Sequence, residues 1–195
     1  PLSDDNPTVR PPVTTILVLA GMISVWLVVQ GAGLDRDLLA GSICNLGLVP
    51  GELTGRALLG FGVPIAPGLS CVVDAEPINW ATPLISMISY MFLHGGWVHL
   101  ISNGLFLWVF GNNIEDVMGR SRFLAFYLIC GLAAAAAHVA VDPSSPIPTV
   151  GASGAISGVM GAYLMLFPAV RVRMLFIFII FFKVIPIPAW AVLFW

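Results

Sequence analysis

Apolar residues in this chain are gathered into runs long enough to cross a membrane, and short polar stretches separate the runs. An uncharged run over residues 13–30 predicts a first helical span, because ~20 apolar residues cover a ~30 Å hydrocarbon core. Later runs predict three more spans over residues 97–117, 123–141 and 153–167, and an apolar tail over residues 174–195 that holds an incomplete fifth span. The polar, proline-rich residues 1–12 predict a disordered cytoplasmic lead.

Residues 31–96 separate the first two spans and are rich in glycine, proline and charge. We interpret them as a long extracytoplasmic and interfacial loop in which residues 84–93, too short to span, form an interfacial helix. Cys44 and Cys71 fall in this loop. They can pair if the loop lies in an oxidising compartment, but two buried thiols fit the sequence equally well.

Composition supports an all-α, polytopic transmembrane helical bundle. Of the 195 residues, 58% are hydrophobic and 9% are charged, against roughly 25% charged in a soluble domain. A net charge of −2 with only 8 Lys+Arg argues against a nucleic-acid partner, since phosphate binding needs a basic surface. The high apolar content instead indicates the lipid bilayer as a partner of the chain. The three cysteines form no close Cys/His group and no nucleotide fingerprint occurs, so no metal and no cofactor are expected.

Basic residues set the predicted orientation, because cytoplasmic loops carry the excess of lysine and arginine. With alternating spans, Arg36 and Arg56 fall on one side of the membrane. The other side carries Arg10, Arg120, Arg122, Arg171, Arg173 and Lys183. This places the N-terminus in the cytoplasm and faces the long loop outward. We expect the membrane to be a bacterial plasma membrane.

The fourth predicted span opens with the sequence V-G-A-S-G-A-I-S-G-V-M-G-A-Y over residues 150–163. Its glycines permit close contact between helices in a membrane. They are Gly151, Gly154, Gly158 and Gly161. Ser153 lies where this helix begins, beside free backbone N–H groups and the positive end of the helix dipole. A helix over residues 153–167 is about 22 Å long, so Ser153 is expected below the outer surface in a hydrated pocket that opens outward.

The second predicted span carries polar residues at its outer end. His99 and Asn103 are four residues apart and therefore share a helix face, at a depth comparable to that of Ser153. Polar groups inside a span are costly and mark function by default, although both residues could simply bond neighbouring helices. The apolar part of this span, residues 97–110, is short, and the polar residues 111–116 are expected to close the helix, with Glu115 and Asp116 as solvated charges at its end.

These residues carry a family resemblance. The stretch His94-Gly95-Gly96-Trp97-Val98-His99-Leu100-Ile101-Ser102-Asn103, followed by Gly151-Ala152-Ser153-Gly154-Ala155, resembles the rhomboid family of intramembrane serine proteases, and the likeness runs from about Trp80 to Trp195. The resemblance implies a six-helix core in which Ser153 is the nucleophile. It also implies that His99 and Asn103, with the Ser153 N–H group, hold the oxyanion, and that His94 and Gly151 support the site.

The general base of the family is a histidine on the sixth span, and we expect it to lie beyond Trp195. A serine hydroxyl is a weak nucleophile without such a base, so the 195-residue chain by itself is expected to be inactive. The remaining histidine, His138, we interpret as a polar residue that faces the loop at a helix end.

The sequence therefore predicts an integral membrane serine endopeptidase that cleaves transmembrane protein substrates near the outer bilayer face. The alternative is a catalytically inactive rhomboid-like protein that binds membrane helices. A transporter or channel is disfavoured, because residues 97–110 and 150–167 contain no acidic side chain. Nothing in the sequence indicates an oligomeric state.

Overall fold

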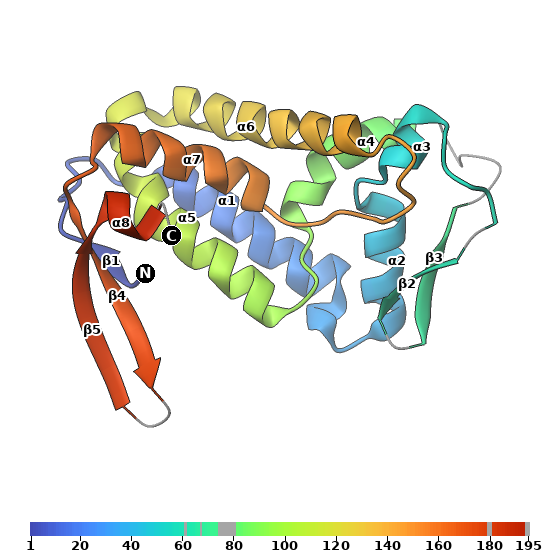
Figure 1. The fold of residues 1–195 in the computed structure, drawn as a ribbon, viewed down its shortest axis with the longest axis horizontal. Coiled ribbons are helices and arrows are strands. Elements are labelled where there is room, and N and C mark those ends of the chain that lie inside the picture. The colour runs from blue at the N-terminus through green and yellow to red at the C-terminus, as the bar shows by residue number, and fades with distance from the viewer. Residues whose placement is uncertain (61, 67, 74–80, 179–180, 194–195) are drawn as a thin grey trace.

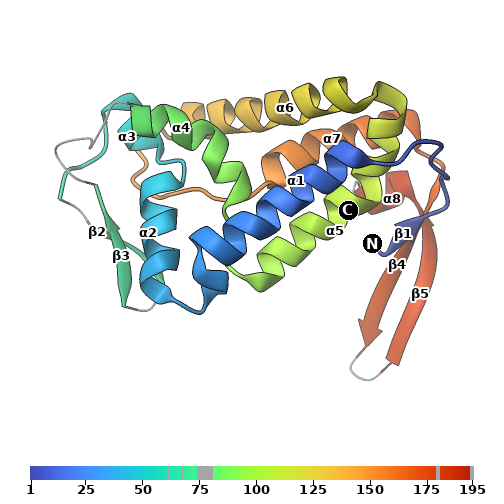
Figure 2. The same cartoon turned by 180° about the vertical axis from the view of Figure 1, so that it is seen from behind.

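The chain folds into a bundle made mostly of helices, consistent with the predicted helical class (Figure 1). The structure is a computed structural model that describes residues 1–60, 62–66, 68–73, 81–178 and 181–193. The bundle comprises α1 (Val13–Ser24), which continues as the π-helical η1 (Val25–Val29), and α5 (Trp97–Met118), α6 (Arg120–Val141) and α7 (Ser153–Leu166). Helix α7 packs against both α5 and α6, and α1 packs against α5 (Figures 1 and 2).

The structure contains a helix at each of the four predicted spans, and the length of each helix decides whether it could cross a membrane. Among the described residues, α6 alone is one continuous helix both long and apolar enough to span a bilayer. A second span is possible if the segments Leu84–Phe92 and Trp97–Met118, bent by 86° relative to each other, are taken as one broken span. Helix α1 with η1, and α7, are apolar but shorter.

Small residues bring α6 and α7 into close contact, as the glycine spacing predicted. A Cβ atom added to Gly154 would lie 2.5 Å from the Ala134 Cβ, and one added to Gly158 would lie 2.3 Å from the Cys130 Sγ. Contacts this short leave room only for hydrogen. Gly161 differs, because an added Cβ there meets no atom within 4 Å.

Helix α5 covers the second predicted span, residues 97–117, and continues to Met118, so the polar residues 111–116, expected to close the helix, lie inside it. Its 22 residues give a length of about 33 Å, so it is not short. The backbone at these polar residues stays helical because their side chains form hydrogen bonds with neighbouring elements. The amide of Asn113 donates to Asp4, and the Glu115 carboxylate accepts from Thr14 N, Thr15 N and Thr15 Oγ1, each at 2.8 Å.

Glu115 is therefore not the solvated charge that the sequence suggested. Only 3% of it is exposed, and it satisfies backbone N–H groups that the first turn of α1 leaves free. Asp116 similarly accepts from the backbone N–H groups of Val9 and Arg10, at 2.8 and 3.0 Å. Together these two carboxylates hold the start of α1 and the segment before it against α5.

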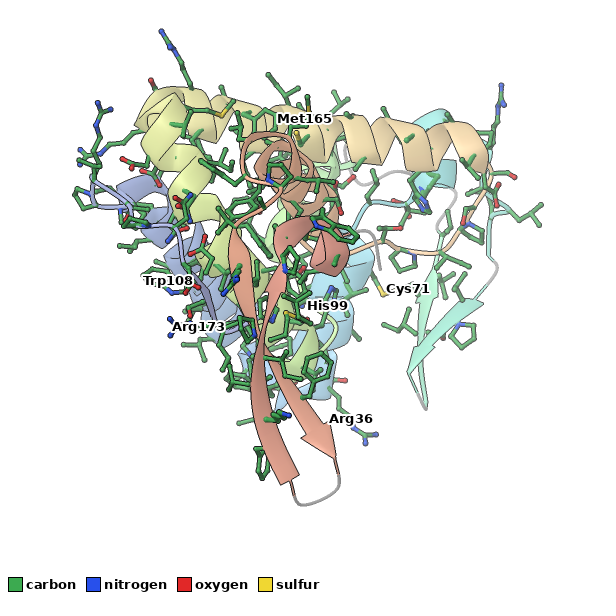
Figure 3. All side chains as sticks on the ribbon, turned by 60° about the vertical axis from the view of Figure 1, so that its left-hand side comes forward. Arg36, Cys71, His99, Trp108, Met165 and Arg173 are labelled. Atoms are coloured by element: carbon green, nitrogen blue, oxygen red, sulfur yellow. A yellow bond between two sulfur atoms is a disulfide. The ribbon has the colours of Figure 1, made fainter. Side chains whose placement is uncertain are left out.

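Residues 1–12, predicted to be disordered, are ordered in the structure. Strand β1 (Ser3–Asp4) pairs antiparallel with β4 (Arg171–Phe178), and Asp5 forms an ion pair of 2.9 Å with Arg173 (Figure 3). The partners of this segment lie more than 100 residues away in the chain, so its own composition gave no sign of them.

The apolar tail also differs from the prediction. In place of an incomplete span, β4 pairs antiparallel with β5 (Phe181–Pro188), and the short helix α8 (Ala189–Leu193) follows. Branched and aromatic side chains favour strands, and the prolines of β5 disfavour a helix but are tolerated on an edge strand such as this one. Residues 179, 180, 194 and 195 of the predicted tail lie outside the described residues.

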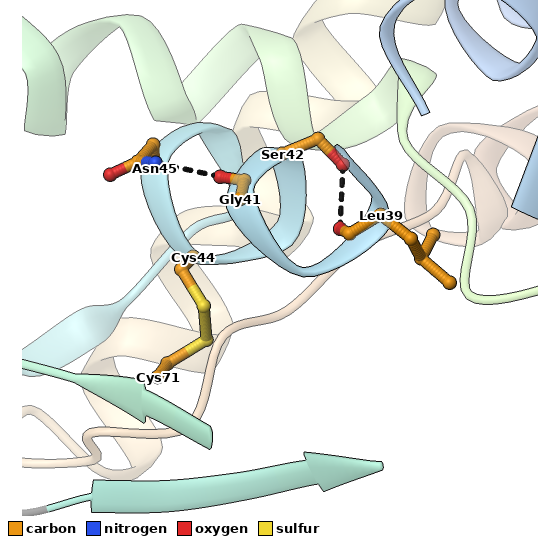
Figure 4. The surroundings of a disulfide bond; sticks show 6 residues. All are labelled: Leu39, Gly41, Ser42, Cys44, Asn45 and Cys71. Carbon is orange, nitrogen blue, oxygen red and sulfur yellow. Dashed lines mark hydrogen bonds between the residues drawn. A yellow bond between two sulfur atoms is a disulfide. The ribbon is translucent and has the colours of Figure 1, made fainter. Parts of the chain in front are cut away.

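The long loop contains several short elements before the 86° bend. These are η2 (Gly31–Gly33), α2 (Arg36–Leu46), α3 (Pro50–Thr54), β2 (Gly62–Ala66), β3 (Leu69–Val72), α4 (Ala81–Ser89) and η3 (Tyr90–Phe92). Strands β2 and β3 form a hairpin, which a disulfide between Cys44 on α2 and Cys71 on β3 ties to α2 (Figure 4). Of the two alternatives for these cysteines, the structure has the bonded pair. Helix α4 with η3 corresponds to the predicted interfacial helix.

Candidate active site

His99 lies in the first turn of α5 and is labelled in Figure 3, and the turn before α5 sets the orientation of its ring. The Gly95 N–H group donates to His99 Nδ1 at 3.3 Å. A ring nitrogen that accepts a hydrogen bond carries no hydrogen, so in the neutral ring the hydrogen lies on Nε2. His99 therefore presents an N–H donor on the side of the ring that faces away from the turn.

This donor points at Gly151, in the loop before α7. A Cβ atom added to Gly151 would lie 2.6 Å from His99 Nε2 and 3.6 Å from Asn103 Nδ2. Gly151 also has φ of +121°, which L side chains rarely adopt. Two independent constraints therefore require glycine here, and together they allow the backbone to approach both side chains.

Asn103 and His94 complete the polar group. Asn103 is 7% exposed, and its Nδ2 has no hydrogen-bond partner among the described residues. His94 is fully buried, its ring centroid lies 5.1 Å from that of His99, and its Nδ1 lies 3.2 Å from the Phe92 carbonyl, which can only accept. Buried polar atoms are nearly always paired, so an unpaired amide aimed at the Gly151 loop is typical of a functional site.

Tyr90 of η3 fixes the Gly151 loop in place. Its carbonyl accepts the Gly151 N–H group at 2.8 Å, and its hydroxyl donates to the Gly131 carbonyl of α6 at 2.8 Å. Tyr90 is 3% exposed. The same residue thus bonds both the loop before α7 and the helix that packs beside α7.

Ser153 is the first residue of α7, and its side chain is exposed. One residue, Ala152, separates it from Gly151, so the Cα atoms of Gly151 and Ser153 lie no more than ~7 Å apart. Ser157, one turn later, donates to the Ser153 carbonyl at 2.7 Å. The structure thus brings His94, His99, Asn103 and Gly151 into one group, and the chain holds Ser153 beside that group at a helix N-terminus.

Comparison with known proteins agrees with these motifs. The family model described as "Rhomboid domain" matches residues 81–195. This chain belongs to the rhomboid family. Membership makes it an integral membrane protein of a family that contains named proteases.

Several rhomboids are similar to this chain. Rhomboid protease GluP of Bacillus subtilis is 36% identical over 114 residues, which cover 58% of this chain and 20% of GluP. RHOMBOID-like protein 5 of Arabidopsis thaliana is 38% identical over 78 residues, 40% of this chain and 25% of the relative. Putative rhomboid protease YdcA of Bacillus subtilis is 35% identical over 78 residues, 40% of this chain and 39% of YdcA. The chain thus spans two fifths or less of these relatives, and no solved structure matches it.

Outside this polar group, His138 bonds the loop before α7. Its Nε2 lies 2.9 Å from Thr149 Oγ1, which confirms the expectation that it faces the loop.

A cavity of about 420 Å³ lies at the opposite end of α5, where Glu115 lines it together with Arg10 and Arg120. Glu115 is 16 residues from His99, about 24 Å along the helix, so this cavity is separate from the site. Within the described part of the chain, no group of three His, Cys, Asp or Glu side chains is placed to hold a metal ion.

One residue beside the site was not identified from the sequence. Gln30 follows η1, is fully buried and bonds the backbone of His94 twice. The available signal was a lone amide at the end of an otherwise apolar run. Because Gln30 was taken only as the last residue of the first predicted span, this signal was not used.

Proposed function

We propose that this protein is an intramembrane serine endopeptidase that cleaves transmembrane segments of membrane proteins near the extracytoplasmic face of the bilayer. In the proposed reaction, Ser153 Oγ attacks the scissile carbonyl and gives its proton to a general base of the full-length protein, the sixth-span histidine that the family resemblance implies, which then protonates the leaving amine. The negative charge that develops on the carbonyl oxygen is held by His99 Nε2–H, Asn103 Nδ2–H and the Ser153 backbone N–H. His94 and Gly151 position these donors.

The observation that supports this proposal is the convergence of two side-chain N–H donors on Gly151, two residues before Ser153. One donor, on His99, has its tautomer fixed by Gly95, and the other, on Asn103, has no partner among the described residues. Donors that are already oriented cost no reorganisation when charge develops, which is why such groups accelerate acyl transfer. The N-terminus of α7 adds its free N–H groups and its dipole at the same place.

The disulfide between Cys44 and Cys71 supports an outward-facing site. Disulfides persist in oxidising compartments and are rare in the cytosol. The loop that carries this bond precedes α4 and η3, and Tyr90 of η3 bonds the Gly151 loop directly. We infer that the loop and the active site share the extracytoplasmic side, with the N-terminus and the α5–α6 connection in the cytoplasm.

The substrate segment must unwind before cleavage, because a helix encloses its own carbonyls in hydrogen bonds. Small or helix-destabilising residues near the scissile bond are therefore expected in substrates. No metal or organic cofactor enters the proposed reaction, since the nucleophile and the oxyanion donors are all side-chain or backbone groups of the protein.

Cleavage of a model transmembrane substrate by the full-length protein in liposomes tests this proposal. Ser153→Ala is expected to abolish cleavage. Ser121→Ala is the matched control, because Ser121 is an exposed serine in the first turn of α6, far from the site, and its loss should leave the rate unchanged. Undiminished cleavage by Ser153→Ala would contradict the assignment. A wild-type protein that captures the substrate without cleaving it would instead support an inactive, helix-binding rhomboid.

A further inference from the structure

The residue that the proposed site leaves unexplained is Gln30, at the end of η1. Its side chain is fully buried, and it makes two hydrogen bonds to a single residue. Gln30 Nε2 donates to the His94 carbonyl at 2.8 Å, and Gln30 Oε1 accepts from the His94 N–H group at 2.8 Å. One amide thus satisfies both backbone groups of His94, across 64 positions of sequence.

The segment that Gln30 holds leads directly to His99. After His94, the chain turns through Gly95 and Gly96 before α5 begins at Trp97. Glycine allows many backbone conformations, so this turn is not restrained by its own residues. The two bonds from Gln30 supply the restraint at the His94 end of the turn.

The next residue in the turn determines which nitrogen of His99 bears hydrogen. Gly95, whose N–H group bonds His99 Nδ1, follows the peptide group that Gln30 holds through the His94 carbonyl. The hydrogen bond at one ring nitrogen of a histidine determines the state of the other. The contacts therefore form a continuous path from Gln30 through the His94–Gly95 backbone to His99, whose Nε2 faces Gly151.

We infer that Gln30 is a positioning residue for the oxyanion donor, and that the first helix thereby takes part in the proteolytic site. Gln30 touches neither the substrate nor Ser153 in this role. It holds the His94–Gly96 turn so that Gly95 keeps His99 as the Nε2–H tautomer with that donor aimed at the Gly151 loop. The expected effect of Gln30 on the cleavage rate rests on the proposed function. The expected effect of Gln30 on the His99 tautomer is independent of that function.

Two variants of the full-length protein test the inference. Gln30→Met has a similar volume but loses both bonds, whereas Gln30→Glu keeps an acceptor for the His94 N–H group and, when ionised, loses the donor to the His94 carbonyl. An oxyanion donor acts on the transition state and not on the bound substrate, so kcat should fall about 10- to 100-fold in both variants while KM stays within about twofold.

Thr15→Val is the matched control for lost stability. Thr15 lies in the same first helix, is fully buried and donates one side-chain hydrogen bond, to Glu115, at the end of the bundle remote from His99. This variant should unfold at a lower temperature than the wild type and retain its kcat. A fall in kcat that Thr15→Val does not share cannot come from destabilisation alone.

The ring ¹⁵N chemical shifts of His99 provide the second measurement. The wild type should show the Nε2–H tautomer, and Gln30→Met should show a loss of that signature to a mixture of tautomers. The inference is overturned if Gln30→Met and Gln30→Glu keep both the wild-type kcat and the Nε2–H signature. If Ser153→Ala retains cleavage, the proposed function fails, and the His99 signature in the Gln30 variants still supports or overturns the positioning role.

Discussion

At the scale of single residues, the site depends on places where a side chain is absent as much as on those where one is present. Gly151 has only hydrogen where a methyl group would overlap His99, and its φ of +121° disfavours any other residue. The backbone before Ser153 can therefore lie against two N–H donors.

Gly151→Ala is accordingly expected to reduce cleavage at least tenfold. The added Cβ would lie 2.6 Å from His99 Nε2, so either the loop or the imidazole must move, and misplacement by about 1 Å can cost on the order of 100-fold in rate. Cleavage of a transmembrane substrate in liposomes measures the effect. Gly161→Ala is the matched control within α7, because a Cβ atom added to Gly161 meets no other atom within 4 Å. This variant should keep the wild-type cleavage rate and stabilise the helix by about 0.5–1 kcal/mol. Equal rates for the two variants would show that the contact is irrelevant.

Sequence reasoning worked well at this scale where the residue types themselves carry the chemistry. The pairing of His99 with Asn103 could be predicted because residues four apart share a helix face. The proximity of Gly151 to both could be anticipated only from the family resemblance. The contribution of Gln30 could not be predicted, because its partner lies 64 residues away and no local pattern indicates that contact.

At the scale of elements, the carboxylate of Glu115 links α5 to the start of α1. It accepts three hydrogen bonds from Thr14 and Thr15, and α1 has no side-chain cap of its own. The polar residues of α5 appeared in the sequence to end that helix, yet they are the residues that bind its neighbours. Predicting this would have required knowing which helices lie side by side.

Glu115→Ala should lower the free energy of unfolding by about 2–3 kcal/mol, because it leaves the buried N–H groups of Thr14 and Thr15 without an acceptor. Thermal or denaturant unfolding of the protein in detergent measures the change. Val117→Ala, at an exposed position on the same helix, should change stability by less than about 0.5 kcal/mol. A similar loss in both variants would argue against the capping role.

The N-terminal strand provides a pH-dependent contact. Burial raises the pKa of Asp4 above its ordinary value of 3.8, although the hydrogen bond from Tyr163 opposes this rise. A carboxyl group with a raised pKa in the folded state contributes stability below its ordinary pKa, and that contribution is lost as pH rises through the folded pKa. The ionised form is the one that burial disfavours.

Asp4→Asn keeps an oxygen that can accept from Tyr163 and Asn113, and it cannot ionise. The melting temperature of this variant relative to the wild type should therefore increase as pH rises from about 4 to about 8. A constant difference for Asp4→Asn across this range would contradict the role assigned to Asp4.

At the scale of the whole molecule, the long loop packs against the helical bundle at several places: Leu48 pairs with Thr149 in the loop before α7, and Thr54 Oγ1 donates to the Pro143 carbonyl. The disulfide consolidates the loop by binding α2 to the β2–β3 hairpin (Figure 4). The positions of the helices could be predicted from the sequence, because the length of an apolar run limits where a membrane helix can lie. The β4–β5 hairpin could not be predicted, since a short apolar run is compatible with either a strand or a helix.

Removal of the disulfide is expected to destabilise the protein by about 3–4 kcal/mol, the loop-closure entropy for a sequence separation of 27 residues. A reductant should therefore lower the melting temperature of the wild type but not that of Cys71→Ser. Cys130→Ala, which removes the free thiol, should remain as sensitive to reductant as the wild type. A wild-type protein insensitive to reductant would show that this bond adds no stability.

Under the proposed function, Tyr90 links the rate of cleavage to the position of α6. It bonds Gly131 through its hydroxyl and Gly151 through its carbonyl, so the spacing of α6 from its neighbours and the position of the loop before the nucleophile are coupled. Substitutions on the outer surface of α6 that shift it slightly should consequently slow the proposed cleavage before they unfold the protein. Bilayer thickness, which alters how such helices tilt, should affect turnover by the same route.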